Sequence, residues 1–401
     1  MSDVPAQSQP ASSVPLALLV IFAGVCGAIH IAKLPPAIHA LQQQLGLSLV
    51  DAGFLLSMVQ LAGMATAIAM GAWADSLGGK RSMVLGLLVL AAASTAGGFA
   101  GSTLMLLALR ALEGFGFLLV VVPAPGLVRQ LVPAGQVSRM LGLWGSYMPL
   151  GTAMALLAGP LWVDHWGWRH WWWSAALLSA ATAVALALLL PARPDNAAAP
   201  AGLATRLRLT LSRGGPWLLA LAFATYSSQW LAVVGFLPTI YQQAGVAAGA
   251  RGVLTALAAA VNIVGNVYAG RLLQKGVAPV RLLTIGFVAM GLSAVVAFAG
   301  ADGAGAPPAV RYIAVLCFSM IGGLVPATLF ALAMRLAPDE RTISTTIGWM
   351  QQWSAFGQFA GPPVVAWVAS RAGGWHWTWA ATGTAALVGL GLARRIGRLA
   401  R

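Results

Sequence analysis

The chain has 401 residues, of which 59% are hydrophobic and only 8% charged, and its mean hydropathy is +0.82. An ordinary soluble domain carries about a quarter charged residues, so this composition excludes a water-soluble globule and predicts a protein embedded in lipid. The net charge of +14 would suggest nucleic acid as the partner of a soluble protein, but here the basic residues must first be placed relative to a membrane. Cys26 and Cys317 both lie inside apolar runs, which favours packing over a disulfide or a metal site.

Apolar runs long enough to cross a bilayer, which takes about 20 residues, follow one another along the chain. They predict twelve transmembrane helices near residues 14–34, 50–73, 82–100, 104–126, 138–162, 170–190, 216–238, 250–272, 280–299, 309–334, 342–368 and 376–394. We therefore expect an all-α integral membrane protein with no soluble domain. Its expected parts are a cytoplasmic tail at 1–13, a six-helix half at 14–190, a cytoplasmic linker at 191–215, a second six-helix half at 216–394 and a basic tail at 395–401.

The loops predict the orientation of the chain. If both termini are cytoplasmic, most of the 23 Lys and Arg residues fall on the cytoplasmic side, whereas Arg169, Arg251 and Arg371 fall outside. Because this bias follows the positive-inside rule, we expect a multi-pass protein of the plasma (bacterial inner) membrane. The net charge is then mainly an orientation signal, and no nucleic-acid partner is expected.

The two halves repeat each other. LAGPLWVDHWGWRHWWW at 157–173 and FAGPPVVAWVASRAGGWHWTW at 359–379 share an Ala-Gly-Pro, an apolar run, a basic residue and then Gly-Trp with further tryptophans. Such self-similarity indicates that one six-helix unit has been duplicated. The tryptophans are expected to form an aromatic belt at the outer membrane interface. Small residues let helices approach and proline removes a backbone hydrogen bond, so the expected helix hinges are Gly159, Pro160, Gly361 and Pro362.

The segment GAWADSLGGKR at 71–81 resembles the signature loop of the major facilitator superfamily. The resemblance implies two pseudo-symmetric six-helix bundles and a cytoplasmic gate formed by Gly71, Asp75, Gly78, Lys80 and Arg81. Asp75 ends its helix, where the helix dipole disfavours a negative charge, so we expect the start of the eleventh helix near Thr342 to hold it when the halves close inside. The alternative is a tight loop whose charges only follow the positive-inside rule.

Two further segments carry family resemblances. RALEGFGF at 110–117 is similar to the fourth-helix signature of the superfamily, with Arg110, Gly114 and Gly116 in place. YSSQWLAVVGFLPTIYQQAG at 226–245 resembles the seventh helix of the cyanate/nitroimidazole-porter-like branch of small-anion carriers. That branch usually has Asn-Leu-Arg-Pro in its first helix, whereas this chain has Ala-Lys-Leu-Pro at 32–35.

Polar residues inside the spans are the candidate site residues, because an embedded charge is costly and by default functional. The resemblance implies a cavity lined by helices 1, 4, 7 and 10. The candidates for binding a solute are His30, Lys33, Arg110, Tyr226, Gln229, Asn262 and Arg311. Three alternatives stay open: Arg110 pairs with Glu113 at i, i+3, Lys33 snorkels to the outer interface, and the amides only join helices. Glu113 is the carboxylate expected to carry a proton, with His30 next.

These features predict a secondary transporter that works by alternating access, as a symporter or antiporter. Lys33, Arg110 and Arg311 outnumber Glu113, so a small anionic solute would relieve the embedded positive charge. Protons are the candidate coupling ion. A multidrug or metabolite efflux carrier is the alternative, and a channel and an integral-membrane enzyme are more distant ones. The sequence contains no Walker A, HExxH or nucleophile-elbow motif, so we expect a monomer without enzyme activity, cofactor or metal.

Overall fold

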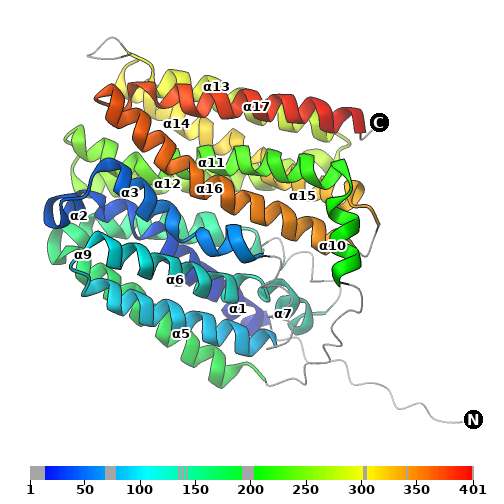
Figure 1. Cartoon of the computed structure of the whole chain (residues 1–401), viewed down its shortest axis with the longest axis horizontal. Helices are drawn as coiled ribbons and strands as arrows, with labels where there is room; N and C mark the ends of the chain where they lie inside the picture. Colours follow the sequence, from blue (N-terminus) through cyan, green and yellow to red (C-terminus); the bar gives the residue numbers. More distant parts are fainter. Residues whose placement is uncertain are drawn as a thin grey trace, which may run out of the picture.

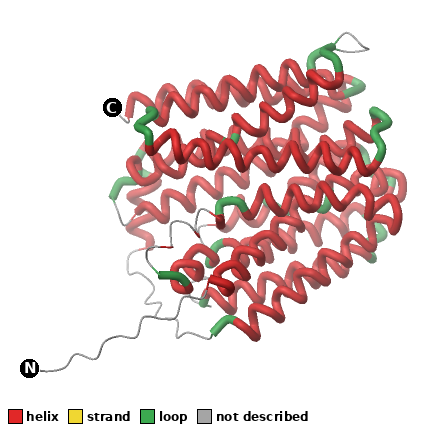
Figure 2. Tube along the Cα trace, turned by 180° about the vertical axis from the view of Figure 1, so that it is seen from behind, coloured by secondary structure: helices red, strands yellow, loops and turns green. Residues whose placement is uncertain are grey.

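The computed structural model describes residues 14–67, 78–133, 136, 140, 143–191, 203–300, 305–339 and 342–399. In these ranges the ordered elements are helices, with no strand (Figure 2). The predicted all-α membrane fold is therefore confirmed.

The N-terminal half is built around one very long helix, α9. It spans Tyr147–Leu189, 43 residues, which would measure about 65 Å if straight, roughly twice the hydrocarbon thickness of a bilayer. Gly167 interrupts it with φ 83°, so α9 holds the fifth and sixth predicted spans as two legs. The other elements of this half are α1 (Val14–Ala32), η1 (Pro35–Ala37), α2 (Ile38–Leu45), α3 (Leu49–Met58), a bent continuation at Leu61–Ala67, α5 (Gly79–Gly98), α6 (Thr103–Val121) and α7 (Ala124–Leu131).

The C-terminal half repeats this plan, with its fifth and sixth spans as two separate helices. Its elements are α11 (Gly214–Gln243), α12 (Ala248–Gln274), α13 (Pro279–Phe298), α14 (Pro308–Gly322), α15 (Leu324–Leu336), α16 (Ile343–Ala372), η3 (Trp375–Trp377) and α17 (Thr378–Leu399). In the described part of the chain eight helices are long and apolar enough to span a membrane, or nine if the bent α3 pair counts as one span.

Helices extend into two of the predicted segments. The linker at 191–215 contains the helix α10 (Leu203–Leu211) and the first residues of α11. The basic tail at 395–401 is not separate, since α17 continues to Leu399. The fourth and tenth predicted helices are each broken, at Val122-Pro123 and at Gly323, because proline and glycine both weaken a helix interior.

Corresponding prolines act differently in the two halves. Pro35 and Pro36 together end α1 and start a 3₁₀ turn, whereas the single Pro238 stays inside the continuous helix α11. One proline removes one backbone donor, but two in succession remove two, and the helix does not continue past them. The N-terminal half therefore has a true break in its first span where the C-terminal half has none.

The two halves lie side by side as two bundles of roughly parallel helices, the N-terminal half below and the C-terminal half above in Figure 1. They meet where α3 packs on α16 and α9 packs on α12. Gly252 makes the second contact possible, because an added Cβ would lie 2.6 Å from the Leu157 carbonyl oxygen.

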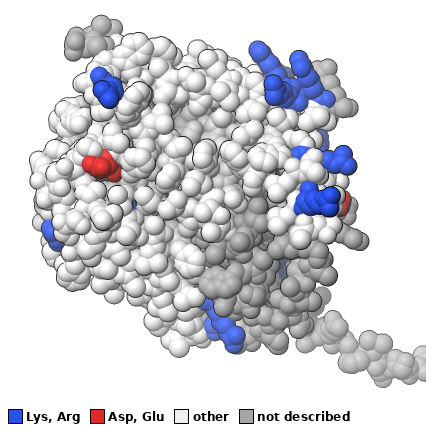
Figure 3. Space-filling view, viewed as in Figure 1, with Lys and Arg blue, Asp and Glu red and all other residues white. Residues whose placement is uncertain are grey.

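Charge separates the two ends of the molecule. We call the end that carries α10 and the C-terminus of α17 the inner end, and the end that carries Gly167 and Gly373 the outer end. Basic side chains gather at the inner end (Figure 3). This distribution agrees with the positive-inside pattern that the sequence predicted.

The repeated tryptophan segments build the same corner in each half. The side-chain oxygen of Gln44, after the first span, accepts hydrogen bonds from Trp168 Nε1 at 2.8 Å and from Arg169 at 3.0 Å. In the other half Gln243 accepts from Trp375 Nε1 at 2.8 Å. The expectation of an interfacial belt was wrong for part of the set: Trp166 is 59% exposed, but Trp168 and Trp172 are only 1% exposed and belong to the core.

Candidate functional site

A narrow pocket lies between the two halves and is almost entirely apolar. It is lined by Ile31, Ala32, Pro35, Leu56, Met148, Thr152, Leu156, Trp230, Leu231, Val234, Gly235 and Gln358. None of these described lining residues carries a charge. Gln358 is already engaged, since its Oε1 accepts a hydrogen bond from Gln60 Nε2 at 3.0 Å across the interface between the halves. Thr152 is the other side chain with a hydroxyl or amide group among the described lining residues.

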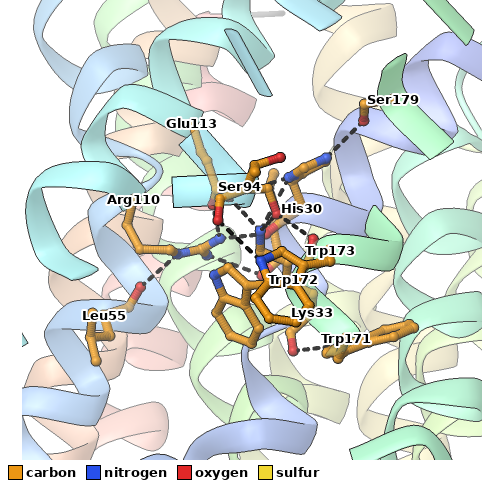
Figure 4. A network of polar contacts seen from close by, with 12 residues as sticks. His30, Lys33, Leu55, Ser94, Arg110, Glu113, Trp171, Trp172, Trp173 and Ser179 are labelled. Carbon is orange, nitrogen blue, oxygen red and sulfur yellow. Dashed lines mark hydrogen bonds and ion pairs between the residues drawn. The ribbon is translucent and has the colours of Figure 1, made fainter. Parts of the chain in front are cut away.

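A buried ion cluster lies behind one wall of this pocket, inside the N-terminal half (Figure 4). Its charged members are Lys33 at the end of α1 and Arg110 and Glu113 of α6, each at most 1% exposed. Glu113 Oε2 contacts Arg110 at 2.7 Å, and its other oxygen contacts Lys33. The Glu113 carboxylate thus forms ion pairs with both Arg110 and Lys33. The structure shows the i, i+3 pair that the spacing of Arg110 and Glu113 predicted.

Arg110 also binds backbone carbonyl oxygens at the point where the helical hydrogen bonding of the first span is interrupted. Its guanidinium donates to the carbonyl oxygens of His30 at 2.5 Å and Ile31 at 3.3 Å, and to that of Leu55 at 3.2 Å. In a continuous helix the Ile31 carbonyl would accept from residue 35, but Pro35 has no N–H. Since all these partners are in place, Arg110 has its charge and most of its donors satisfied without a bound solute.

Lys33 has three acceptors, one for each N–H of its ammonium group. They are Glu113, Ser94 Oγ at 2.5 Å and His30 Nδ1 at 3.3 Å. The ammonium nitrogen also lies 4.7 Å from the centre of the Trp172 ring, a cation–π distance. The idea that Lys33 snorkels to the outer interface was wrong, because the residue is fully buried.

His30 completes the cluster, and its Nδ1 lies 3.3 Å from Lys33 Nζ and 3.4 Å from Glu113 Oε1. With Nδ1 accepting from Lys33, its Nε2 is free to donate to Ser179 Oγ, which lies at 2.8 Å. Ser94 in turn donates to the Trp172 carbonyl at 2.7 Å. The sequence analysis did not single out Ser94, Ser179 or Trp172. The signal that was available is that both serines interrupt long apolar helices.

The predicted residues of the C-terminal half form a separate, uncharged network. Asn262 donates to Tyr226 OH at 3.0 Å and to the Ser319 carbonyl at 2.8 Å, which joins three helices. Trp230, whose ring lines the pocket, is fixed by a 3.1 Å bond from its Nε1 to Ser319 Oγ. This network therefore sets the position of an aromatic pocket wall.

Gln229 and Arg311 lie elsewhere. Gln229 bonds to the Thr225 carbonyl of its own helix, and Arg311 donates to the carbonyls of Ala306 and Ala299 at the outer loop before α14. None of the predicted solute-binding side chains is among the described residues that line the pocket.

The predicted cytoplasmic gate is described only in part. Gly71 and Asp75 lie outside the described residues. Gly78 has φ 81° and precedes α5, and Lys80 in the first turn of α5 donates to the Ala187 carbonyl at 2.9 Å, which joins the start of α5 to the end of α9. Arg81 is exposed. At the start of α16, where a partner for Asp75 was expected, Asp339 Oδ1 accepts a hydrogen bond from the Thr342 N–H at 2.8 Å, and among the described residues no side chain caps the helix.

The predicted hinges lie at close approaches between helices. An added Cβ on Gly159 would lie 2.4 Å from Pro36, and one on Gly361 would lie 2.3 Å from the Ser228 carbonyl oxygen. Pro160 and Pro362 follow them inside α9 and α16. Bending at these positions stays a prediction.

An ion pair closes the outer end between the halves. Arg251 at the start of α12 reaches Asp164 of α9 at 3.2 Å. The arginine side chain is 5% exposed and the aspartate side chain 44% exposed. The pair lies beside the close backbone contact at Gly252, so two contacts join α9 to α12 at this end.

Two pseudo-symmetric helical bundles with a pocket between them define a multi-pass membrane carrier. The model of the Major Facilitator Superfamily matches residues 16–362, and the chain belongs to that family.

Sequence relatives match only part of the chain. The "Tetracenomycin C resistance and export protein" of Streptomyces glaucescens is 30% identical over 159 residues, which cover 39% of this chain and 30% of the relative. A puromycin resistance protein of Streptomyces alboniger is 30% identical over 198 residues, 48% of this chain and 38% of the relative. The chain thus matches less than half of the length of either relative.

The fold is similar to that of a solved structure, a bacterial homologue of the human lysosomal transporter Spinster in an inward-facing and occupied conformation. The TM-score is 0.81 at 16% sequence identity, and the superposition covers 98% of each chain. The branch of small-anion carriers suggested by residues 226–245 is not among these matches.

Proposed function

We propose that this chain exports small organic solutes with a large apolar surface, and that they bind in the pocket between the halves. The uncharged lining of that pocket carries the proposal. Binding sites for such solutes are concave and mostly apolar, with a few polar groups that fix orientation; here Trp230 offers an aromatic face and Thr152 a hydroxyl. The resistance and export proteins among the relatives support the outward direction.

A small anion is the second candidate, because Lys33 and Arg110 still exceed Glu113 by one charge. The contacts of Arg110 argue against an anion. Its guanidinium group is bound to Glu113 and to backbone carbonyls, so it is not free to bind an anion. Arg311, which raised the predicted charge further, bonds to an outer loop. Without Arg311, the embedded cations Lys33 and Arg110 exceed the carboxylate Glu113 by one positive charge, and this charge is buried behind the pocket wall.

Transport in proteoliposomes separates the two candidates. The purified protein is tested separately with two sets of solutes. The first set is puromycin and other neutral or cationic aromatic solutes, and the second is a panel of small anions. We expect saturable transport of the aromatic solutes and none of the anions. Transport of anions alone would refute the proposal.

A matched pair of substitutions locates the binding site. Val234 lines the pocket and is 1% exposed, whereas Val264 of α12 is 54% exposed on the outside of the bundle. Val234→Trp fills the pocket and should weaken solute binding at least about tenfold, equal to about 1.4 kcal/mol. Val264→Trp should transport normally. Equal transport by both variants would place the binding site elsewhere.

A further inference from the structure

We propose that Lys33, and not Glu113, is the residue that binds and releases the proton in a proton-coupled transport cycle. This inference rests on the proposed export function for its physiological meaning, but the titration of Lys33 is a property of the protein alone. It assigns to a buried amine the role that the sequence alone suggested for the carboxylate.

The first argument is charge balance within the closed cluster. The charged or titratable groups that face Lys33 are His30 on its own helix and Arg110 and Glu113 on α6, while α5 and α9 offer the Ser94 hydroxyl and the Trp172 ring. Arginine does not lose its proton in proteins. Loss of the Lys33 proton leaves one neutral Arg110–Glu113 pair. Protonation of Glu113 would instead leave two buried cations without a counter-ion, which is the most costly arrangement.

The second argument is that the contacts fit both forms of the amine. The charged form has an acceptor for each of its three N–H groups. In the neutral form the lone pair needs a donor, and His30 Nδ1 lies 3.3 Å away. The histidine supplies that donor by changing tautomer, with Ser179 then donating to its Nε2 at 2.8 Å. No buried polar atom of the cluster loses its partner in the exchange.

The third argument is the position of Lys33 behind the pocket wall. Ile31, Ala32 and Pro35, on the same turn, line the pocket. The Lys33 carbonyl accepts a hydrogen bond from Trp171 Nε1 at 2.9 Å, which fixes this turn against α9. A change in the contacts of Lys33 therefore acts directly on residues that would touch a solute.

The step itself is a simple proton transfer. The Lys33 ammonium breaks one N–H bond and gives the proton to water that enters when the cluster opens to one side, and the amine keeps the electron pair. On the opposite side the amine takes a proton from water again. One proton is exchanged in each cycle, and no oxidant or further reactant is required.

Lysine NMR tests the proposal without any solute. The sequence has lysine only at Lys33, Lys80 and Lys275, so protein labelled at the lysine side chains and held in lipid nanodiscs gives few signals. The Lys33→Arg variant identifies the signal of Lys33 by its loss. We expect Lys33 to convert from charged to neutral at a lower pH than Lys80 and Lys275. If Lys33 stays charged as long as the other two, the proposal is refuted.

Transport by two variants tests the coupling. Lys33→Arg keeps the positive charge but has no proton to release, and Lys33→Met imitates the neutral amine. In both, a pH gradient should no longer raise puromycin accumulation above its value without a gradient, while Lys33→Met still exchanges puromycin down its concentration gradient. Gradient-driven accumulation that persists in Lys33→Arg, or a wild-type protein that transports puromycin without responding to the gradient, overturns the proposal. If wild-type protein moves no aromatic solute but the NMR titration is as expected, only the export function fails.

Discussion

The outer ion pair should control which side of the carrier is open, and the two partners should differ in effect. In Asp164→Asn the Arg251 guanidinium keeps its charge but loses its counter-ion while only 5% exposed. Its Nε already lacks a hydrogen-bond partner among the described residues. A buried charged group left without its partner costs about 1–3 kcal/mol, and opening the outer end relieves this cost by admitting water. The equilibrium should therefore shift toward the outer-open state by a factor of about 5–150.

The partner variant should do the opposite. Arg251→Met keeps most of the side-chain stem, removes the buried charge and leaves Asp164, which is 44% exposed and therefore solvated. An exposed aspartate loses about 0–1 kcal/mol with its partner, and an open outer end would expose the methionine to water. This variant should stay closed. The double variant should resemble Arg251→Met, because no buried charge remains to be relieved.

Spin-label distances across the outer end measure this shift. Labels at His165 and Ser370, both exposed, report the separation of the two halves after Cys26 and Cys317 have been replaced. Asp164→Asn should add a population at longer distance, and Arg251→Met should not. Equal distance distributions in the two variants would refute the reasoning, since they would show that the buried charge does not drive opening.

Three further predictions test the packing and the helix ends. Gly114→Ala should sharply lower the yield of folded protein in size-exclusion chromatography, because its Cβ would lie 2.1 Å from the Val59 carbonyl oxygen and such overpacking costs about 1–3 kcal/mol. Gln44→Ala should lower the melting temperature more than Gln243→Ala, since Gln44 accepts two hydrogen bonds worth about 1 kcal/mol each and Gln243 accepts one. Asp339→Ala should raise hydrogen exchange at the Thr342 N–H before α16, because this amide loses a hydrogen bond worth about 1 kcal/mol. Unchanged yield, equal melting temperatures or unchanged exchange would contradict the respective prediction.

The architecture could be read from the sequence because it depends on periodic, local features. The apolar runs indicate where the spans lie, the repeat indicates that they form two halves, and the loop charges indicate their orientation. A bilayer forces nearly every span to be a helix. Even the contact between Arg110 and Glu113 follows from spacing along one helix. The interruptions of the helices were harder to predict from the sequence, because Pro35-Pro36 and Pro238 differ only in the number of missing backbone N–H donors.

The candidate site was harder to predict because it depends on which groups meet across helices. The sum of embedded charges treated Arg110 as free, but the contact with the His30 and Ile31 carbonyls arises only when α1 breaks beside α6. The tryptophans were placed at the interface because their composition is typical of it. Depth in the bundle is a tertiary property, and Trp172 lies in the core beneath Lys33.

The unequal halves have a consequence for how this carrier evolves. The ion cluster belongs to the N-terminal half alone, whereas Trp230, Leu231, Val234 and Gly235 form the aromatic and aliphatic side of the pocket on α11. Mutations on α11 alter what fits without touching the buried charges. With the proposed export function, laboratory selection for resistance to a new toxic compound should therefore enrich changes on this helix, while the charged residues behind the opposite wall stay constant.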